Sequence, residues 1–304
     1  MSAKPETPII RQLSLPDNRL LAYLLDESPE GGPVVLLSNP LCTNIAVWDH
    51  IVPVLNHAGL RTLRYDQPGH GDSSAPADLT TTTFDSMVED VAYMLDALGI
   101  SKLWAWIGVS MGAAAGIFFA TSHPGVVKKL VVCDTITCSP LNAGVEDPFG
   151  PRVASAREEG GMEGNTEATL RRWFGDAWLE GHPKEAERMR RIVMRTSLDG
   201  METCCHALAS RSFDLRPLLR RVGGAVEEAV CVVGEKDANL PQTMEDMRAQ
   251  VEEGFREAGK TGKVELVVIP DAGHVCFVDG LEEFVRLIPR FIQAEKKYGD
   301  SATT

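Results

Sequence analysis

Residues 102–122 read KLWAWIGVSMGAAAGIFFATS, within a chain of 304 residues. The first part of this stretch is apolar almost throughout, which is typical of a strand buried on both faces of a parallel sheet. From Met111 onwards, small and apolar residues follow at helical spacing. Between the two parts stands Gly108-Val109-Ser110-Met111-Gly112, a G-x-S-x-G sequence in the strand-to-helix context that this motif requires. The stretch therefore predicts a strand, a sharp turn that exposes a serine, and a helix.

Strand-like and helix-like stretches alternate on both sides of this unit. Apolar, mostly β-branched runs predict strands at residues 33–38, 60–65, 102–108, 128–133, 229–235 and 264–270. Apolar residues at helical spacing predict helices at 46–57, 84–98, 111–122, 241–257 and 281–296. This order predicts an α/β fold with a doubly wound, mostly parallel sheet. Ahead of it, residues 10–15 and 20–25 flank turn residues and predict a hairpin at one edge.

The alternation stops after Cys133, because charged helical segments replace strands from about Pro140 to Leu219. We predict a helical cap over residues 140–219, inserted into one core domain formed by residues 1–139 and 220–304. Doubly wound sheets bind their ligands at the carboxyl ends of the strands. The cap is therefore expected to lie across that edge and to cover the substrate site.

Composition and charge indicate which classes of binding partner the protein is expected to have. Hydrophobic residues make up 44% and charged residues 24% of the chain, as in ordinary globular proteins. A formal net charge of -13 repels phosphate backbones and anionic lipid headgroups. No apolar run approaches the roughly 18 to 20 residues that span a bilayer, and no signal-peptide pattern opens the chain. We expect a cytoplasmic protein that binds a small-molecule substrate and neither nucleic acid nor membrane; self-association into a homo-oligomer stays open.

No cofactor or metal is predicted. The seven cysteines lie mostly in or beside apolar runs, which favours buried thiols in a reducing compartment. Adjacent Cys204 and Cys205 lack metal spacing and are expected to pack within a helix. The sequence GKTGK at 259–263 precedes a strand instead of a helix, so it indicates a turn and not a phosphate loop. The sequence at 69–71 lacks the third glycine of a dinucleotide site.

A serine nucleophile needs a base, and the base needs a carboxylate that orients it. His274 directly follows the last predicted strand, which places it at a carboxyl strand end. Asp237 follows the strand before that one, so the chain order is serine, aspartate, histidine. We therefore predict a catalytic triad of Ser110, Asp237 and His274. His70 remains a rival base, and Glu235 an alternative acid.

An oxyanion hole requires two backbone N–H groups aimed at the developing charge. Met111 follows the nucleophile at a helix N-terminus and is predicted to supply the first. The second is expected from the loop at 38–43, after the strand that ends at Ser38. Since Pro40 has no N–H, we predict Leu41 as the donor and keep Cys42 as the alternative.

Further motifs surround the predicted triad. They are SNPLCT at 38–43 with VWD at 47–49, LRYD at 63–66 and GHG at 69–71, and in the predicted cap GM at 161–162, RWF at 172–174 and GM at 200–201 ahead of CCHAL at 204–208. Together these residues resemble the 3-oxoadipate enol-lactonases of the α/β-hydrolase superfamily, over nearly the whole chain. The resemblance implies an α/β-hydrolase fold and the hydrolysis of a small lactone or ester through an acyl-enzyme.

The resemblance also implies which residues face the substrate: Asn39, Cys42, Phe149, Arg152 and Trp173. Two of them depart from the family, because Cys42 replaces a usual glycine and Phe149 stands where tryptophan is expected. If the substrate carries a carboxylate, Arg152 or Arg157 is the expected counter-charge. A carbon–carbon bond hydrolase, an acyltransferase and a receptor-like binding protein of the same fold remain alternatives.

Overall fold

The computed structural model describes residues 9–26 and 30–292. One sheet runs through the molecule in the order β1-β2-β4-β3-β5-β6-β7-β8. β2 is antiparallel to β1 and to β4, and the remaining pairs are parallel. The strands are β1 (Arg11–Ser14), β2 (Leu20–Asp26), β3 (Val34–Ser38), β4 (Arg61–Tyr65), β5 (Leu103–Val109), β6 (Val127–Cys133), β7 (Glu228–Gly234) and β8 (Glu265–Ile269). The doubly wound, mostly parallel sheet and its edge hairpin are confirmed.

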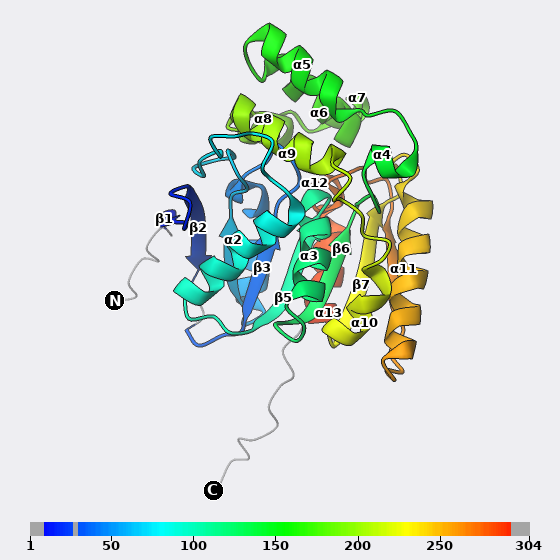
Figure 1. Ribbon diagram of the computed structural model, residues 1–304. Helices are drawn as coiled ribbons and strands as arrows, with labels where there is room; N and C mark the ends of the chain where they lie inside the picture. The colour runs from blue at the N-terminus through cyan, green and yellow to red at the C-terminus, as the bar shows by residue number, and fades with distance from the viewer. Residues whose placement is uncertain (1–8, 27–29, 293–304) are drawn as a thin grey trace, which may run out of the picture.

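Helices cover both faces of the sheet (Figure 1). On the front face lie α2 (Phe84–Ala97), α3 (Met111–Ser122) and α10 (Val222–Ala225), and α11 (Leu240–Glu257) packs on β7 and β8. Behind the sheet, α13 (Leu281–Ile292) follows the short α12 (Cys276–Asp279) and contacts α1 (Val52–His57). None of the described helices is long and apolar enough to span a bilayer.

Two predicted helices have different bounds in the structure. The segment 46–57 is split into the 3-10 helix η1 (Ile45–Trp48) and α1. Pro53 stands in the first turn of α1, where a missing N–H costs nothing, so a new helix starts there. The terminal helix is described to Ile292, and the predicted residues 293–296 lie outside the described residues.

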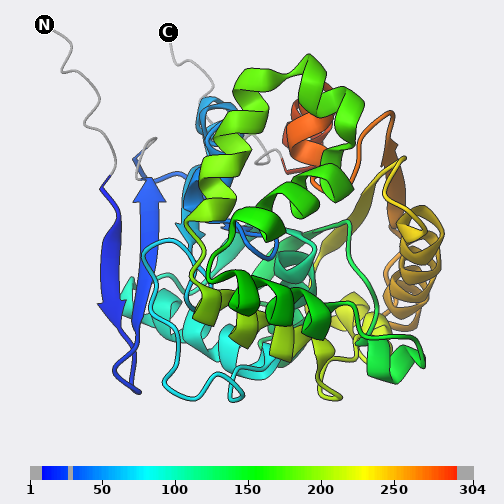
Figure 2. The ribbon, with the colours of Figure 1, turned by 90° about the horizontal axis from the view of Figure 1, so that it is seen from above.

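Helices also fill the segment between β6 and β7. They are α4 (Pro140–Ala143), α5 (Phe149–Glu159), α6 (Glu163–Phe174), α7 (Asp176–Gly181), α8 (Pro183–Met194) and α9 (Leu198–Ala209). Figure 1 shows α5 to α9 above the upper edge of the sheet, and Figure 2 shows them from above, lying across the strand ends. The chain then returns through η2 (Leu219–Arg221) and α10, which pack on α11. The cap limits at 140 and 219 stay a prediction, and we call α4 to α9 the inserted helices.

The seven cysteines are all buried free thiols. Cys204 and Cys205 lie within α9, where both are buried among apolar side chains. The prediction that this pair packs inside a helix is confirmed. Burial raises the pKa of the Cys205 thiol, so it stays protonated at neutral pH.

α3 approaches the sheet too closely for side chains at two positions. A methyl group on Gly112 would lie 2.1 Å from the Ser38 carbonyl oxygen of β3, and one on Gly108 would lie 2.2 Å from the Gly112 carbonyl oxygen. These backbone-to-backbone contacts seat the first turn of α3 directly on the ends of β3 and β5. Ser110, between the two glycines, is thereby fixed at the edge of the sheet.

Gly112→Ala is expected to destabilise the protein by about 1 to 3 kcal/mol, because the added methyl group overpacks a site enclosed by backbone. Gly224→Ala, in α10, is the matched control, since a methyl group there would meet no atom within 4 Å. The control should leave stability unchanged or raise it slightly. Denaturant unfolding of both variants measures the difference, and equal midpoints would contradict the packing argument.

Candidate active site

The turn between β5 and α3 holds Ser110 in a strained conformation. Its φ is 55° and its ψ is -118°, a region that side-chain-bearing residues rarely adopt. The Ser110 N–H donates to the Cys133 carbonyl oxygen at 2.8 Å, which ties the turn to the end of β6. The serine side chain faces a pocket of about 650 Å³ that is lined by residues of the strand ends and of the inserted helices. This volume suits a small-molecule ligand.

His274 and Asp237 meet at the same pocket. Nδ1 of His274 lies 2.7 Å from Oδ2 of Asp237, and both side chains are largely buried. Because Nδ1 faces the carboxylate, Nε2 is the nitrogen that can exchange a proton with a nucleophile. Glu235, the alternative acid, instead accepts a hydrogen bond from the Asp271 N–H at 3.0 Å. The structure therefore brings Ser110, Asp237 and His274 to one pocket, as the triad prediction requires.

The loop that carries His274 is held from two directions. The His274 N–H donates to the Trp173 carbonyl oxygen of α6 at 3.1 Å, and the two rings stack with centroids 6.0 Å apart. The Gly273 N–H donates to Oδ2 of Asp279 at 2.6 Å. Burial raises the pKa of the Asp279 carboxyl to about 6. An inserted helix thus contacts the candidate base directly.

Asp134 is a further acid at this edge, and sequence reasoning missed it. It follows β6, has a φ of 46°, and is completely buried. Its Oδ1 accepts a hydrogen bond from the Gly234 N–H at 2.8 Å, which joins the ends of β6 and β7. Burial, with the nearby charge of Asp237, raises the pKa of the Asp134 carboxyl well above its ordinary value. The available signal was an acid directly after a buried strand, the pattern that singled out Asp237.

Leu41 and Met111 both line the pocket together with Ser110. Within residues 9–26 and 30–292, neither backbone N–H donates a hydrogen bond, so both are available to an oxyanion. The Cys42 N–H is occupied, because it donates to Nε2 of His70 at 3.0 Å. Among the two donors considered in this loop, the geometry favours Leu41.

His70 does not line the pocket and is completely buried. While Nε2 accepts from the Cys42 N–H, Nδ1 lies 2.9 Å from the Pro68 carbonyl oxygen. Burial lowers the pKa of His70 to about 4. With both ring nitrogens engaged away from Ser110, His70 is placed as part of the loop structure.

The residues expected to face the substrate separate into two groups. Cys42, Phe149, Arg152 and Trp173 line the pocket. Asn39 does not: its amide N–H donates to the Tyr65 carbonyl oxygen at 2.9 Å, and its Oδ1 accepts from the Trp48 indole at 2.7 Å. Its side chain therefore holds the loop together below the pocket.

The two arginines considered as counter-charges also differ. Arg157 is exposed and bound to acids, at 2.6 Å from Asp199 and 2.7 Å from Glu202. Arg152 lines the pocket and forms no ion pair among the described residues; its guanidinium lies 5.7 Å from the centre of the Phe149 ring. A substrate carboxylate could therefore meet Arg152, while Arg157 is already neutralised.

Arg172, in α6, is a second pocket arginine, which the sequence indicated only as part of a family motif. It too forms no ion pair with a described carboxylate. Partial burial and the neighbouring Arg152 lower the pKa of the Arg172 guanidinium to about 10, so it stays charged at neutral pH. The adjacent Trp173 has a buried indole N–H without an acceptor in the described structure. The inserted helices thus give the pocket hydrogen-bond donors and positive charge.

The sheet order, the strained serine turn and the inserted helices define an α/β hydrolase. The chain matches the alpha/beta hydrolase fold family over residues 33–190, just over half of its 304 residues. The protein therefore belongs to this family. Its relatives support a hydrolase that acts on esters or lactones.

Among these relatives, 3-oxoadipate enol-lactonase 1 of Acinetobacter baylyi is 26% identical over 88% of this chain and 91% of its own. The pimeloyl-[acyl-carrier protein] methyl ester esterase of Methylococcus capsulatus is 30% identical, over 88% of this chain and 98% of its own. In solved structures, the enol-lactonase from Burkholderia xenovorans superposes with a TM-score of 0.80 at 26% identity, covering 93% of this chain and all of that one. The resemblance to enol-lactonases is confirmed.

The buried His70 predicts a specific pH dependence of stability. Its folded-state pKa of about 4 lies below its ordinary value of 6.5, so the unfolded chain binds more protons between these values. Stability from this site is fully present above about pH 6.5 and is lost as the pH falls towards 4. By linkage, the wild type should lose about 2 kcal/mol relative to His70→Gln between pH 7 and pH 5. Urea unfolding at both pH values tests this, and parallel pH profiles would contradict it.

Proposed function

We propose that this protein is a serine hydrolase that cleaves a small lactone or ester through an acyl-enzyme, and that its substrate carries a carboxylate. The observation that carries the catalytic part is the 2.7 Å contact between His274 and Asp237 at the pocket that also exposes Ser110 on its strained turn. The similarity to enol-lactonases and to an ester hydrolase supports the bond type.

In the proposed reaction, Oγ of Ser110 attacks the carbonyl carbon while Nε2 of His274 accepts the hydroxyl proton. The N–H groups of Leu41 and Met111 stabilise the resulting oxyanion. Collapse of the tetrahedral intermediate breaks the acyl–oxygen bond, and the protonated His274 returns the proton to the leaving oxygen. Water, deprotonated by His274, then attacks the acyl-enzyme. The bond to Oγ of Ser110 breaks, His274 returns the proton to Oγ, and the acid is released. Asp237 stays ionised and stabilises the imidazolium throughout.

The proposal that the substrate carries a carboxylate is supported by two positive charges in the pocket that no described acid neutralises. Arg152 and Arg172 reach the pocket from neighbouring helices, and neither is paired with an acid among residues 9–26 and 30–292. Glu146 also lines the pocket, but it is exposed and pairs with neither arginine. A guanidinium in a partly dry pocket favours an anion strongly, because protein replaces the water that would otherwise screen it. The overall charge of -13 repels an anionic substrate at long range, so an anion needs local positive charge in order to bind. The two arginines supply that charge inside the pocket.

The triad is tested by Ser110→Ala, His274→Ala and Asp237→Asn. Each variant should fold normally and lose turnover of p-nitrophenyl acetate by roughly three or more powers of ten. Because a triad acts as a unit, Ser110→Ala/His274→Ala should be scarcely slower than either single variant. A fluorophosphonate probe should label the wild type and leave Ser110→Ala unlabelled. Wild-type turnover in any single variant would remove that residue from the mechanism.

The arginine pair is tested by comparing a carboxylate-bearing lactone with p-nitrophenyl acetate. Arg152→Ala and Arg172→Ala should each lower kcat/KM for the lactone roughly ten- to a hundredfold, mostly through KM, because each removes a charge-assisted hydrogen bond worth about 1.5 to 3 kcal/mol. Hydrolysis of the neutral ester should change by less than about threefold, since that contact is absent.

Arg157→Ala is the matched control for both arginine variants, because it removes an exposed arginine that is already paired with Asp199 and Glu202. It should leave both substrates unaffected. Equal losses on the two substrates in Arg152→Ala or Arg172→Ala would assign that arginine to the support of its helix. No loss on either substrate would contradict the anionic class of substrate.

A further inference from the structure

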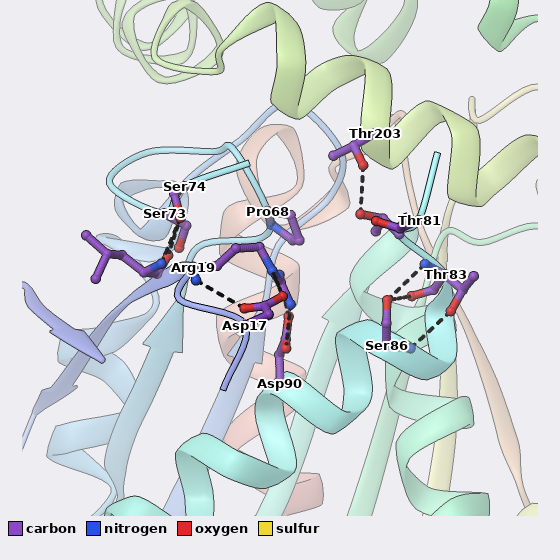
Figure 3. A network of polar contacts seen from close by, with 12 residues as sticks. Asp17, Arg19, Pro68, Ser73, Ser74, Thr81, Thr83, Ser86, Asp90 and Thr203 are labelled. Atoms are coloured by element: carbon purple, nitrogen blue, oxygen red, sulfur yellow. Dashed lines mark hydrogen bonds and ion pairs between the residues drawn. The ribbon is translucent and has the colours of Figure 1, made fainter. Parts of the chain in front are cut away.

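The loop at residues 66–74 lies between the inserted helix α9 and the loop at residues 38–43, which we call the oxyanion loop. Figure 3 shows Pro68, Ser73 and Ser74 of this loop, with Thr203 of α9 above. The Gly69 carbonyl oxygen accepts hydrogen bonds from the N–H and the hydroxyl of Ser197, at 3.1 and 2.9 Å. The Cys204 thiol lies 3.7 Å from the Pro68 carbonyl oxygen. The N-terminal half of α9 is therefore hydrogen-bonded to this loop.

The backbones of α9 and of this loop also pack closely. A methyl group on Gly200 of α9 would lie 2.2 Å from the Gly69 carbonyl oxygen, so the two backbones touch. At the start of the loop, the Asp66 carboxylate accepts from the N–H groups of Ile45 and Asp72, at 2.7 and 3.1 Å. Towards the sheet, the Ser73 hydroxyl accepts from the Ala22 N–H of β2 at 2.8 Å. Loop 66–74 is thus held by the sheet side and by the inserted helices at once.

His70 connects this loop to the oxyanion loop, and its partners fix its tautomer. The Pro68 carbonyl oxygen can only accept, so Nδ1 of His70 carries the proton at 2.9 Å from it. The Cys42 backbone N–H can only donate, so Nε2 is the unprotonated acceptor at 3.0 Å. A neutral imidazole with this tautomer satisfies both groups, whereas a protonated one would turn an N–H towards the Cys42 N–H.

Cys42 needs this support because its backbone is unfavourable. Its φ is 62°, in the region that favours glycine, and its side chain is buried. A buried backbone donor without an acceptor is unfavourable, so the loop is expected to reorganise if His70 is lost. Leu41, the proposed oxyanion donor, is the residue directly before Cys42. The Leu41 N–H lies one peptide before the Cys42 N–H, so reorganisation of this short loop is expected to displace it.

We infer that His70 is a positioning residue for the oxyanion hole: its Nε2 holds the Cys42 N–H and thereby aims the Leu41 N–H at the reacting carbonyl. Through Pro68 and Gly69 the same histidine links the oxyanion hole to α9, so the seating of the inserted helices bears on the chemical step. This inference rests on the proposed acyl-enzyme mechanism. His70 does not line the pocket, so its effect is expected on the stability of the transition state and not on substrate binding.

Three substitutions at His70 separate its two hydrogen bonds. In His70→Gln the side-chain oxygen can reach the Nε2 position and accept from the Cys42 N–H. In His70→Asn the shorter amide reaches only the Nδ1 position, near the Pro68 carbonyl oxygen. His70→Leu fills the space and makes neither bond. The three variants therefore rank the importance of the Cys42 contact at similar side-chain volume.

The readouts are kcat and KM for p-nitrophenyl acetate and the Ki of phenylboronic acid, which forms a tetrahedral adduct on the serine. Removing an oxyanion donor costs roughly a hundred- to a thousandfold in kcat, so misdirecting one should cost about ten- to a hundredfold. His70→Asn and His70→Leu should show that loss with KM within about threefold, and their Ki should rise by the same factor as kcat falls. His70→Gln should stay within about fivefold of the wild type.

Two control variants separate the positioning role of His70 from a loss of stability and from a failure of the triad. Val91→Ala removes buried volume on α2, away from the pocket, and should lower stability without lowering kcat. Ser110→Ala tests the proposed function itself: if turnover persists in it, the acyl-enzyme mechanism fails. If Ser110→Ala is inactive but folded His70→Asn or His70→Leu keeps the wild-type kcat, the positioning inference fails alone.

The positioning inference also fails if His70→Gln loses as much kcat as His70→Asn, or if His70→Gln does not fold. Should His70→Leu not fold, the two amide variants decide the question.

Discussion

Contact between the backbones of α3 and β3 is the constraint on which the rest of this protein depends. Gly112 sits against the Ser38 carbonyl oxygen with no room for a side chain, and this close approach forces the chain to reverse sharply at Ser110. At this position Ser110 has an unfavourable backbone conformation, and the packing around it keeps the residue in that conformation. Because β5, β7 and β8 are parallel, the residues that follow them reach the same edge of the sheet.

One inserted helix, α6, contributes both to the substrate pocket and to the support of His274. α6 supplies Arg172 to the pocket, where it can meet a substrate, and the Trp173 carbonyl oxygen to the His274 N–H, where it supports the candidate base. Chemistry on a fold of this kind is usually separable from substrate choice, because inserted segments vary while the sheet is kept. In this chain the separation is incomplete, since moving α6 would change both the binding donors and the seat of His274.

Buried polar groups beneath the pocket account for the precision of its loops. Asp134 joins the ends of two strands, Asp279 holds the Gly273 N–H, and His70 bridges two loops with opposite ends of one ring. In a medium of low dielectric such bonds are strong, and losing one partner leaves the other unsatisfied. Each of these groups therefore fixes the conformation of one backbone segment. The orientation of the proposed oxyanion donors and of His274 depends on these segments.

The sequence by itself determined the sheet, the serine turn and the residues brought to the edge. Periodicity and the position of Ser110, Asp237 and His274 directly after strands were enough for this, because a parallel sheet converts chain order into spatial order. Only the tertiary structure decided the partners of buried polar groups. It turned Asn39 towards Tyr65 and Trp48, paired Arg157 with acids, left Arg172 beside Arg152, and placed Asp134 and His70 in supporting positions. Such contacts join residues far apart in the chain, and their direction depends on rotamers and loop backbones that no local sequence pattern encodes.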